Sequence, residues 1–331
     1  MSDPQSELDP SASISNKPLM PASTSEQILV IKHGALGDFV LATGPFKAIR
    51  NHHPEAHVIL LTTPPLGLIA QSTGWFDDVW VDERPKVWQF RSWLRVTRRL
   101  YEHGFERVYD LQNSDRTCTY FRLWPKPRPP WSGIARGSSM PHNSPNRDKI
   151  HTLMRQAEQL ALAGIQSVPL PDVSWAKTDI SQFGLKGPFA LMVPGSSAHR
   201  PLKRWPTNQV IKLAQHIASH QITPVLIGTE AERDVLTQVA AAVPQAIDLC
   251  NKTCFKQLAS LARNAKFAIG NDTGPMHVIA ATGCITSVLF STISNPIRTA
   301  PVGTNVNVIR CPILSQLSIH TVLQGLPPFD A

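Results

Sequence analysis

An aspartate near the start of the chain, Asp38, occupies a position that could support acid–base chemistry. It lies in the stretch IKHGALGDFVLATGPFKAIR, residues 31–50, which predicts a buried strand, a turn with Gly34 and Gly37, and an amphipathic helix. A carboxylate in the first turn of that helix either stabilises the helix N-terminus or takes a proton from a bound hydroxyl. The stretch alone leaves both roles open.

A second loop gathers hydroxyl groups and cations. The sequence VPGSSAHRPLKRWP follows an apolar run and contains Ser196, Ser197, Arg200, Lys203 and Arg204 before a Trp-Pro pair that predicts a helix start. These groups suit a bound anion. The alternative is a surface loop whose cations are only solvated.

A third loop, IGNDTGPMH at residues 269–277, ends another buried strand. Thr273 or Gly274 would cap the next helix, and the free amides there suit a phosphate group. The alternative is that Asp272 and Thr273 merely cap their own helix. His277 is interpreted as an ordinary first-turn residue in preference to a catalytic one.

Two glutamates follow a further strand in LIGTEAERD. Glu230 or Glu232 could accept hydrogen bonds from a ribose diol, although carboxylates at helix starts are also common because of the helix dipole. The sequence does not choose between the two residues.

The patterns of several other site classes are missing from the sequence. Gly34 and Gly37 have no third glycine to complete a dinucleotide fingerprint, and there is no D-x-D or H-E-x-x-H motif. We therefore expect no nicotinamide, flavin or other cofactor and no bound metal ion. The five cysteines are irregularly spaced, so they predict reduced thiols instead of disulfides or a zinc site.

Length and composition predict two α/β domains. The chain has 331 residues, of which residues 1–25 are rich in Ser and Pro and predict a disordered leader. The longest apolar stretch is broken by Pro64 and Pro65 and is too short to span a bilayer. We expect a cytoplasmic protein.

The net charge of +8 is concentrated in one segment. Residues 84–149 hold 14 Lys/Arg against 5 Asp/Glu, together with several tryptophans. Such a segment can meet nucleic acid, an anionic membrane surface or an anionic substrate, or it can form a solvated basic face without a partner.

Strand-length apolar runs alternate with helix-length segments along the chain. The runs are QILVIKH, AHVILLT, DDVWVD and RVYDLQ in the first half, and FALMVPG, TPVLIG, KFAIGND and ITSVLF in the second. Alternation of this kind predicts parallel sheets, and the Pro- and Gly-containing residues 169–188 predict a linker. We expect two Rossmann-like domains, residues 26–175 and 176–331, with parallel sheets that face a central cleft.

The three loops taken in order resemble those of glycosyltransferase family 9, the heptosyltransferases. The likeness rests on ILVIKHGALGDFVLATGPFKAIRNHHPEA, on PGSSAHRPLKRWP and on NDTGPMHVIAATG. It implies an α/β GT-B fold, an acceptor held mainly by the first domain and an ADP-sugar held mainly by the second. It also implies an inverting transfer that needs no metal ion.

The resemblance assigns roles to individual residues. Asp38 matches the family's proposed catalytic base, and the loop around it, His33, Gly34 and Gly37, would face the acceptor. The remaining positions would contact the donor: Lys203, Ser196, Ser197, Asp272, Thr273 and Gly274 at the diphosphate, and Glu230, Glu232 and Thr253 at the nucleoside.

We therefore expect a glycosyltransferase that moves a heptose or related sugar from an ADP-sugar to an anionic lipopolysaccharide core acceptor. It would act as a monomer, bind no nucleic acid and touch the cytoplasmic face of the inner membrane peripherally. The alternatives are a family member with another nucleotide-sugar or glycan acceptor, a nucleotide-binding protein without turnover and, last, a nucleic-acid binder.

Overall fold

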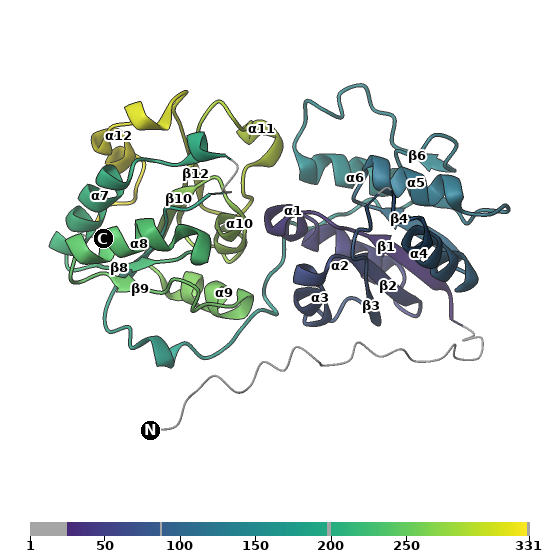
Figure 1. Cartoon of the computed structure of the whole chain (residues 1–331), viewed down its shortest axis with the longest axis horizontal. Helices are drawn as coiled ribbons and strands as arrows, with labels where there is room; N and C mark the ends of the chain where they lie inside the picture. The colour runs from purple at the N-terminus through teal and green to yellow at the C-terminus, as the bar shows by residue number, and fades with distance from the viewer. Residues whose placement is uncertain (1–24, 87, 197–199, 330–331) are drawn as a thin grey trace.

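The computed structural model describes residues 25–86, 88–196 and 200–329 (Figure 1). Apart from Ser25, the expected leader therefore lies outside the described residues, as does Ser197. Within the described part of the chain, no helix has the length and apolar character needed to cross a membrane.

The first domain is built on a parallel sheet of six strands in the order β3-β2-β1-β4-β5-β6. Its central strands are continuous apolar runs such as QILVI, because helices cover both of their faces. The strands are β1 (Gln27–Ile31), β2 (His57–Thr62), β3 (Asp78–Val81), β4 (Arg107–Asp110), β5 (Trp131–Gly133) and β6 (Met140–Pro141).

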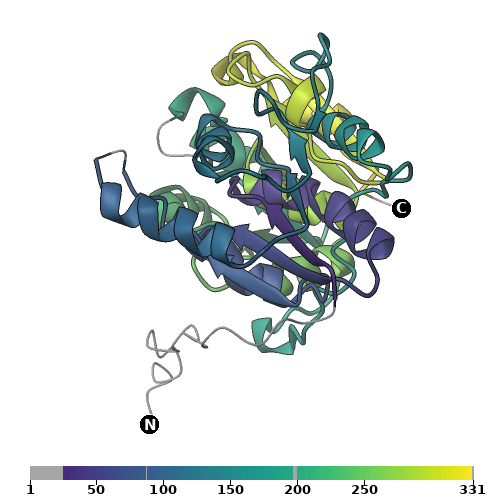
Figure 2. The same cartoon turned by 90° about the vertical axis from the view of Figure 1, so that its right-hand side faces the viewer.

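Helices cover the two faces of this sheet separately. One face packs against α1 (Leu36–Leu41), α2 (Thr43–His52), α3 (Pro64–Gln71) and α6 (Thr152–Leu162). The other face packs against α4 (Phe90–Glu102) and α5 (Asp115–Leu123). Figure 2 shows α4 along one outer edge of the molecule.

The second domain repeats this plan in the order β12-β11-β10-β7-β8-β9, again with parallel pairing. Its strands are β7 (Phe189–Val193), β8 (Thr223–Leu226), β9 (Ile247–Asp248), β10 (Phe267–Asn271), β11 (Thr286–Phe290) and β12 (Val306–Arg310).

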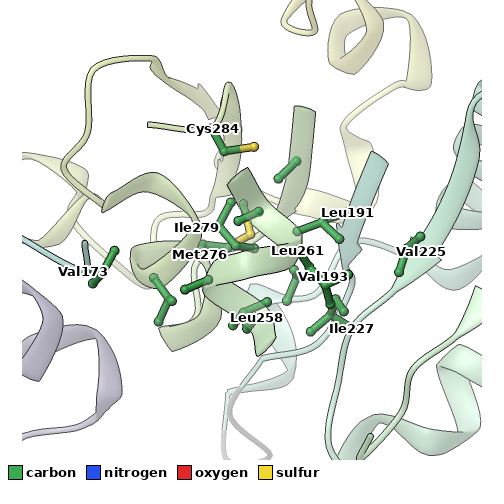
Figure 3. Close-up of a cluster of buried hydrophobic side chains, with 14 of the residues drawn as sticks. Val173, Leu191, Val193, Val225, Ile227, Leu258, Leu261, Met276, Ile279 and Cys284 are labelled. Atoms are coloured by element: carbon green, nitrogen blue, oxygen red, sulfur yellow. The ribbon is translucent and has the colours of Figure 1, made fainter. Parts of the chain in front are cut away.

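The two faces of the second sheet also carry separate groups of helices. The cluster in Figure 3 joins one face to α9 (Phe255–Asn264) and α10 (Gly274–Ala281). On the other face lie α7 (Thr207–Ser219), α8 (Arg233–Ala242) and α12 (Ile319–Gln324). Short helical turns complete the domain: η1 (Ser181–Phe183), η2 (Pro201–Lys203), η3 (Glu230–Glu232), α11 (Pro296–Thr299) and η4 (Leu314–Gln316).

The expected fold class, two α/β domains with parallel sheets, is confirmed. Each apolar run named above contains a strand. The strands that the sequence analysis missed are β5, β6, β9 and β12. Three of them are only two or three residues long, and β12 is a half-exposed edge strand, so none has a continuous apolar run.

The chain crosses between the domains at Asp172 and Val173. Asp172 is held by the first domain, where its amide donates to Thr43 Oγ1 at 2.9 Å and its carboxylate pairs with Lys47 at 2.6 Å. Val173 packs in the core of the second domain, and its carbonyl accepts a hydrogen bond from Arg263. The boundary between residues 175 and 176 stays a prediction.

Helix α1 forms a direct contact between the domains. Its Val40 is buried within the hydrophobic cluster of the second domain. A Cβ atom added to Gly37 would lie 2.7 Å from His277 Cδ2, and one added to Gly274 would lie 3.0 Å from Leu36 Cβ. The start of α1 therefore packs closely on the start of α10, beside it in Figure 1.

Candidate functional site

A cleft of about 1020 Å³ opens between the two domains. It lies beyond the carboxyl ends of strands β1, β7, β8, β10 and β11, where parallel sheets place their ligand sites. Its walls include Asp38 from the first domain and Lys203, Glu232, Thr253 and Asp272 from the second. The three loops singled out in the sequence therefore meet in one cavity.

Asp38 lies in the first turn of α1 and is partly exposed to the cleft. Gly34 makes room for it, since a Cβ atom there would lie 2.7 Å from Asp38 Cβ. The N-cap residue of α1 is Ala35, and the Asp38 carboxylate accepts no hydrogen bond from any described residue. Its oxygens are thus available to a ligand hydroxyl.

His277 lies on the opposite wall, with its ring against Gly37. Burial lowers the pKa of this histidine from 6.5 to about 4, although the nearby carboxylates of Asp272 and Asp38 act in the opposite direction. The ring is therefore neutral near pH 7. Its Nδ1 atom is buried and has no hydrogen-bond partner among the described residues.

Lys203 and Asp272 form an ion pair on the floor of the cleft. The Lys203 Nζ and Asp272 Oδ2 atoms are 2.5 Å apart, and both side chains are about nine-tenths buried. Asn271 connects the two loops that carry them, because its Oδ1 accepts from the Trp205 amide at 3.2 Å and its Nδ2 donates to the Pro194 carbonyl at 2.5 Å. The cation and the carboxylate are therefore fixed relative to one another.

Thr273 is the N-cap of α10, and Gly274 is the first residue of that helix. The threonine side chain makes no capping bond, so it leaves the amides of the first turn directed at the cleft. Ser196, in the loop after β7, is buried and its hydroxyl donates to the Arg200 carbonyl at 3.4 Å. Cations and amide donors thus face a common volume.

The structure separates the two candidate glutamates. Glu230 is exposed and forms a two-point ion pair with Arg233 at 2.6 Å, and it does not line the cleft. Glu232 does line the cleft, and its side chain lies against Gly195, where a Cβ atom would clash at 2.3 Å. Its carboxylate accepts from the amide and hydroxyl of Thr229.

A flat apolar surface lies near these polar groups. Thr253 and Phe255 line the same part of the cleft. The Phe255 ring stacks on Trp175 with centroids 5.2 Å apart and an interplanar angle of 1°. Trp175 belongs to the linker, so the linker supports one wall of the cavity.

Buried charges around Asp38 were missed by the sequence analysis. Lys32 directly follows strand β1 and is 4% exposed, with its Nζ donating to the Leu111 carbonyl at 3.3 Å. Burial lowers its pKa, and Asp38 and Asp110 are the nearest carboxylates that oppose this. Burial raises the pKa of Asp110 to about 6. The signal in the sequence is a charged residue near the end of two apolar runs, the lysine of QILVIKH and the aspartate of RVYDLQ.

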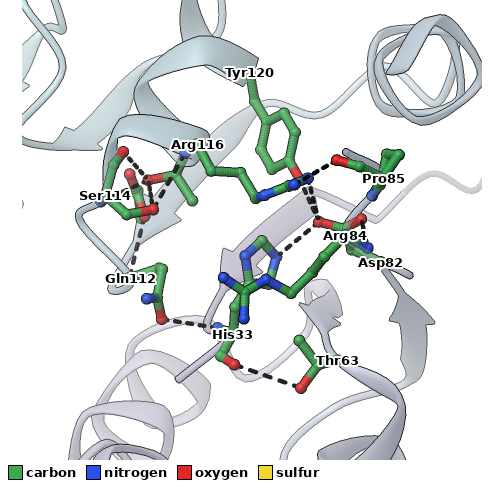
Figure 4. A network of polar contacts seen from close by, with 11 residues as sticks. His33, Thr63, Asp82, Arg84, Pro85, Gln112, Ser114, Arg116 and Tyr120 are labelled. Atoms are coloured by element: carbon green, nitrogen blue, oxygen red, sulfur yellow. Dashed lines mark hydrogen bonds and ion pairs between the residues drawn. The ribbon is translucent and has the colours of Figure 1, made fainter. Parts of the chain in front are cut away.

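The expected acceptor-side residue His33 belongs to a polar network at the same edge of the sheet (Figure 4). Its Nε2 lies 3.6 Å from Asp82 Oδ2, and its pKa is lowered by burial to about 4. Asp82 also accepts a hydrogen bond from the Tyr120 hydroxyl and lies 3.6 Å from Arg116. His33 therefore supports the loop from below and does not line the cleft, whereas Gly37 does.

Other side chains give no sign of a metal site. Among the described residues, no three His, Cys, Asp or Glu side chains come together as metal ligands would. The cysteines of the chain are free thiols, and Cys118, Cys250 and Cys284 are buried.

Comparison with known families gives a match that includes parts of both domains. The family model described as Glycosyltransferase family 9 (heptosyltransferase) matches residues 93–322, which is more than half of the chain. The chain belongs to glycosyltransferase family 9. This confirms the resemblance found in the sequence and identifies the protein as a glycosyltransferase.

The curated relatives that match this chain are distant from it in sequence. The chain is 25% identical over 319 residues to lipopolysaccharide heptosyltransferase 2 of Escherichia coli K12, covering 86% of this chain and 88% of the relative. It is 28% identical over 115 residues to lipooligosaccharide heptosyltransferase 2 of Haemophilus influenzae Rd, covering 33% of each chain.

Solved structures share the two-domain fold. The structure of E. coli ADP-heptose lipopolysaccharide heptosyltransferase II has a TM-score of 0.73 at 20% identity and covers 90% of this chain and 97% of its own. An E. coli heptosyltransferase solved with ADP has a TM-score of 0.71 at 18% identity, covering 90% and 98%. At these identities the likeness shows the GT-B fold alone.

Proposed function

We propose that this family 9 glycosyltransferase moves a heptose from ADP-heptose to a lipopolysaccharide core acceptor, with inversion and without a metal ion. The observation that carries the proposal is the placement of Asp38 across one cleft from the Lys203–Asp272 pair and the start of α10. The names of the E. coli relatives, and the ADP bound to one neighbour, support the choice of sugar and nucleotide.

The second domain offers groups for each part of the donor. Lys203 and the amides of Thr273 and Gly274 would hold the diphosphate, with Ser196 beside them. Glu232, not Glu230, is suited to the ribose hydroxyls because only Glu232 lines the cleft. A nucleoside base would pass along Thr253 and the aromatic surface beside it.

The chemistry follows from the two walls. Asp38 takes the proton from the acceptor hydroxyl while that oxygen forms its bond to the anomeric carbon on the face opposite the diphosphate. The bond from the anomeric carbon to the diphosphate oxygen breaks, and its electron pair leaves with ADP. Lys203 and the α10 amides stabilise the charge that grows there, which is the task a metal ion performs in other transferases.

Crowded cations beside Asp38 support an anionic acceptor. Burial lowers the pKa of Arg155, and the neighbouring Arg298 lowers it further. Arg147 is affected in the same way by burial and by Arg155. Of these cations, Arg298 lines the cleft, and an acceptor carboxylate or phosphate beside it would offset the repulsion within the group. We therefore propose that the acceptor binds on this side of the cleft.

A transfer assay tests the proposal. The protein is incubated with ADP-heptose and a heptose-deficient core acceptor, and ADP release is measured with the mass of the product. Asp38→Ala should lower kcat by about 10²- to 10⁴-fold, the usual contribution of a general base, while ADP still binds. Asp115→Ala is the matched control, because Asp115 lies in the first turn of α5 and does not line the cleft.

The outcomes separate the parts of the proposal. If the unmodified protein binds ADP but transfers no sugar, the assigned sugar or acceptor is wrong and the proposed donor site is retained. If the unmodified protein does not bind ADP, the proposed donor site is wrong as well. If Asp38→Ala and Asp115→Ala lower kcat equally, Asp38 is not the general base.

A further inference from the structure

The outer face of α4 and the loop before it carry apolar and cationic side chains that no other described element covers. Trp88 is 76% exposed and Phe90 is 68% exposed, and Leu94 and Tyr101 are also exposed. The opposite face of the helix, with Leu100, packs onto the first sheet. Large apolar side chains gathered on one exposed face indicate an interaction surface.

Basic residues alternate with these apolar groups. Lys86, Arg91 and Arg95 are exposed, and none forms an ion pair with a carboxylate of the described chain. Lys86 Nζ lies over the Trp88 ring at 5.2 Å, whereas Arg98 is partly neutralised by Glu102 at 2.7 Å. The face is therefore cationic as well as apolar.

The position of this face relates it to the cleft. Strand β3 ends at Val81, and α4 begins at Phe90, so the N-terminal turn of α4 lies at the carboxyl edge of the first sheet. The same edge carries Asp38. In Figure 2 the helix lies on the outside of the molecule, where a broad surface can reach it.

We infer that this α4 face, formed by Lys86, Trp88, Phe90, Arg91, Leu94 and Arg95, docks on an anionic bilayer. Charge complementarity argues for this partner, because arginine and lysine are attracted to anionic lipid headgroups and tryptophan and phenylalanine insert at the headgroup level. The surface is the exposed side of a helix and the loop before it, which a planar partner can reach. The inference rests on the proposed function in one respect, since a lipid-linked acceptor would then meet the cleft from the same membrane.

Vesicle flotation tests the inference directly. The full chain is mixed with vesicles of phosphatidylcholine that contain 30% phosphatidylglycerol, or with phosphatidylcholine alone. We expect binding to the anionic vesicles that weakens as salt is raised. Arg91→Glu/Arg95→Glu should weaken it at least tenfold, and Trp88→Ser/Phe90→Ser should weaken it at high salt too.

The matched control reverses the same number of charges elsewhere. Lys186 and Lys212 are exposed in the second half of the chain, so Lys186→Glu/Lys212→Glu should leave vesicle binding within about twofold of the unmodified protein. ADP affinity and melting temperature should be alike in all variants, which excludes misfolding as the cause of lost binding.

Several results would overturn the inference. The first is that the unmodified protein does not float with anionic vesicles. The second is that the control variant loses as much vesicle binding as Arg91→Glu/Arg95→Glu. The third is that the protein is a dimer that only Trp88→Ser/Phe90→Ser dissociates. Tighter, salt-dependent binding to a polynucleotide than to the vesicles would assign the face to nucleic acid instead.

The test also separates this inference from the proposed function. At a saturating concentration of a delipidated core acceptor, Arg91→Glu/Arg95→Glu should keep the unmodified maximal rate, whereas transfer to the vesicle-embedded acceptor should fall. If the unmodified protein floats with anionic vesicles but transfers no sugar, the docking face is supported and the proposed function is wrong.

Discussion

The buried ion pair of Lys203 and Asp272 lies in the cleft where we propose that the donor binds. A buried charge is tolerated because its partner is near, and removing one partner leaves the other unpaired in a poorly solvated place. We predict that Lys203→Met lowers the free energy of unfolding by about 3–5 kcal/mol. It should also weaken ADP binding, because it removes the cation that we assign to the diphosphate. Urea unfolding and calorimetric titration with ADP measure the two effects.

The double variant Lys203→Met/Asp272→Asn separates these effects. It removes the unpaired carboxylate, so most of the lost stability should return, while ADP binding stays weak. Recovery of both properties would show that Lys203 does not bind the donor. Recovery of neither would show that the pair is not the source of the lost stability.

His277 makes stability depend on pH. Its pKa is 6.5 in an ordinary environment and about 4 in the fold, so the unfolded chain takes up a proton that the folded chain does not. The stability that this neutral histidine contributes is therefore complete above pH 6.5 and is lost as pH falls toward 4. Between pH 5 and 6, His277→Asn should reduce the slope of the unfolding free energy by about 1.4 kcal/mol per pH unit.

An exposed histidine provides the control for this pH effect. His320 lies on α12 and is exposed, so it is solvated in both states. His320→Asn should leave the slope unchanged in urea unfolding measured at several pH values. A slope in His277→Asn equal to that of the unmodified protein would show that His277 is solvated in the native state.

At the scale of elements, the contact between α1 and α10 fixes the position of Asp38 relative to the start of α10. Both helices approach closely because each has a glycine at the contact. We predict that Gly37→Ala lowers kcat at least tenfold and lowers the melting temperature. Its new Cβ atom would lie 2.7 Å from His277 Cδ2, so the helices must separate.

A second helical glycine serves as the control. At Gly67 in α3, an added Cβ atom would meet only Val81 Cγ2 at 3.5 Å, an ordinary contact. Gly67→Ala should keep full activity and gain up to about 1 kcal/mol of stability from helix propensity. If Gly37→Ala were as active as Gly67→Ala, close approach of α1 and α10 would not matter for transfer.

The sequence could predict the main elements because buried parallel strands leave a continuous apolar run. It could also predict the loops after them, since Asp38, Lys203 and Asp272 lie in the segments that follow such runs. The sequence could not predict which of the two glutamates lines the cleft, because this depends on the contact that Glu230 makes with Arg233 in the folded chain. The Lys32 environment was equally hidden, since it depends on neighbours distant in the chain.

At the scale of the whole molecule, the two walls of the cleft belong to different domains, so transfer requires their relative position to be controlled. The linker restricts the relative position of the domains over two residues, because Asp172 is bound to α2 and Val173 packs in the core of the second domain. A second set of contacts joins the domains at the start of α6, where His151 and Thr152 hydrogen-bond to the carbonyls of Ala300 and Arg298. A hinge motion between the domains would therefore have to shift the contacts of α1 and α6, with residues 172 and 173 as the covalent connection.

Releasing the linker from the first domain should loosen this control. We predict that Asp172→Ala lowers kcat and broadens the distance distribution in X-ray scattering, because the pair with Lys47 is lost. ADP affinity should be unchanged, since the groups that we assign to the donor all belong to the second domain. Asp179→Ala is the matched control, because Asp179 is an exposed linker residue whose carboxylate accepts hydrogen bonds from the amide and hydroxyl of nearby Ser181. If both variants scatter and turn over like the unmodified protein, Asp172 does not set the domain arrangement, and the contacts of α1 and α6 must hold it alone.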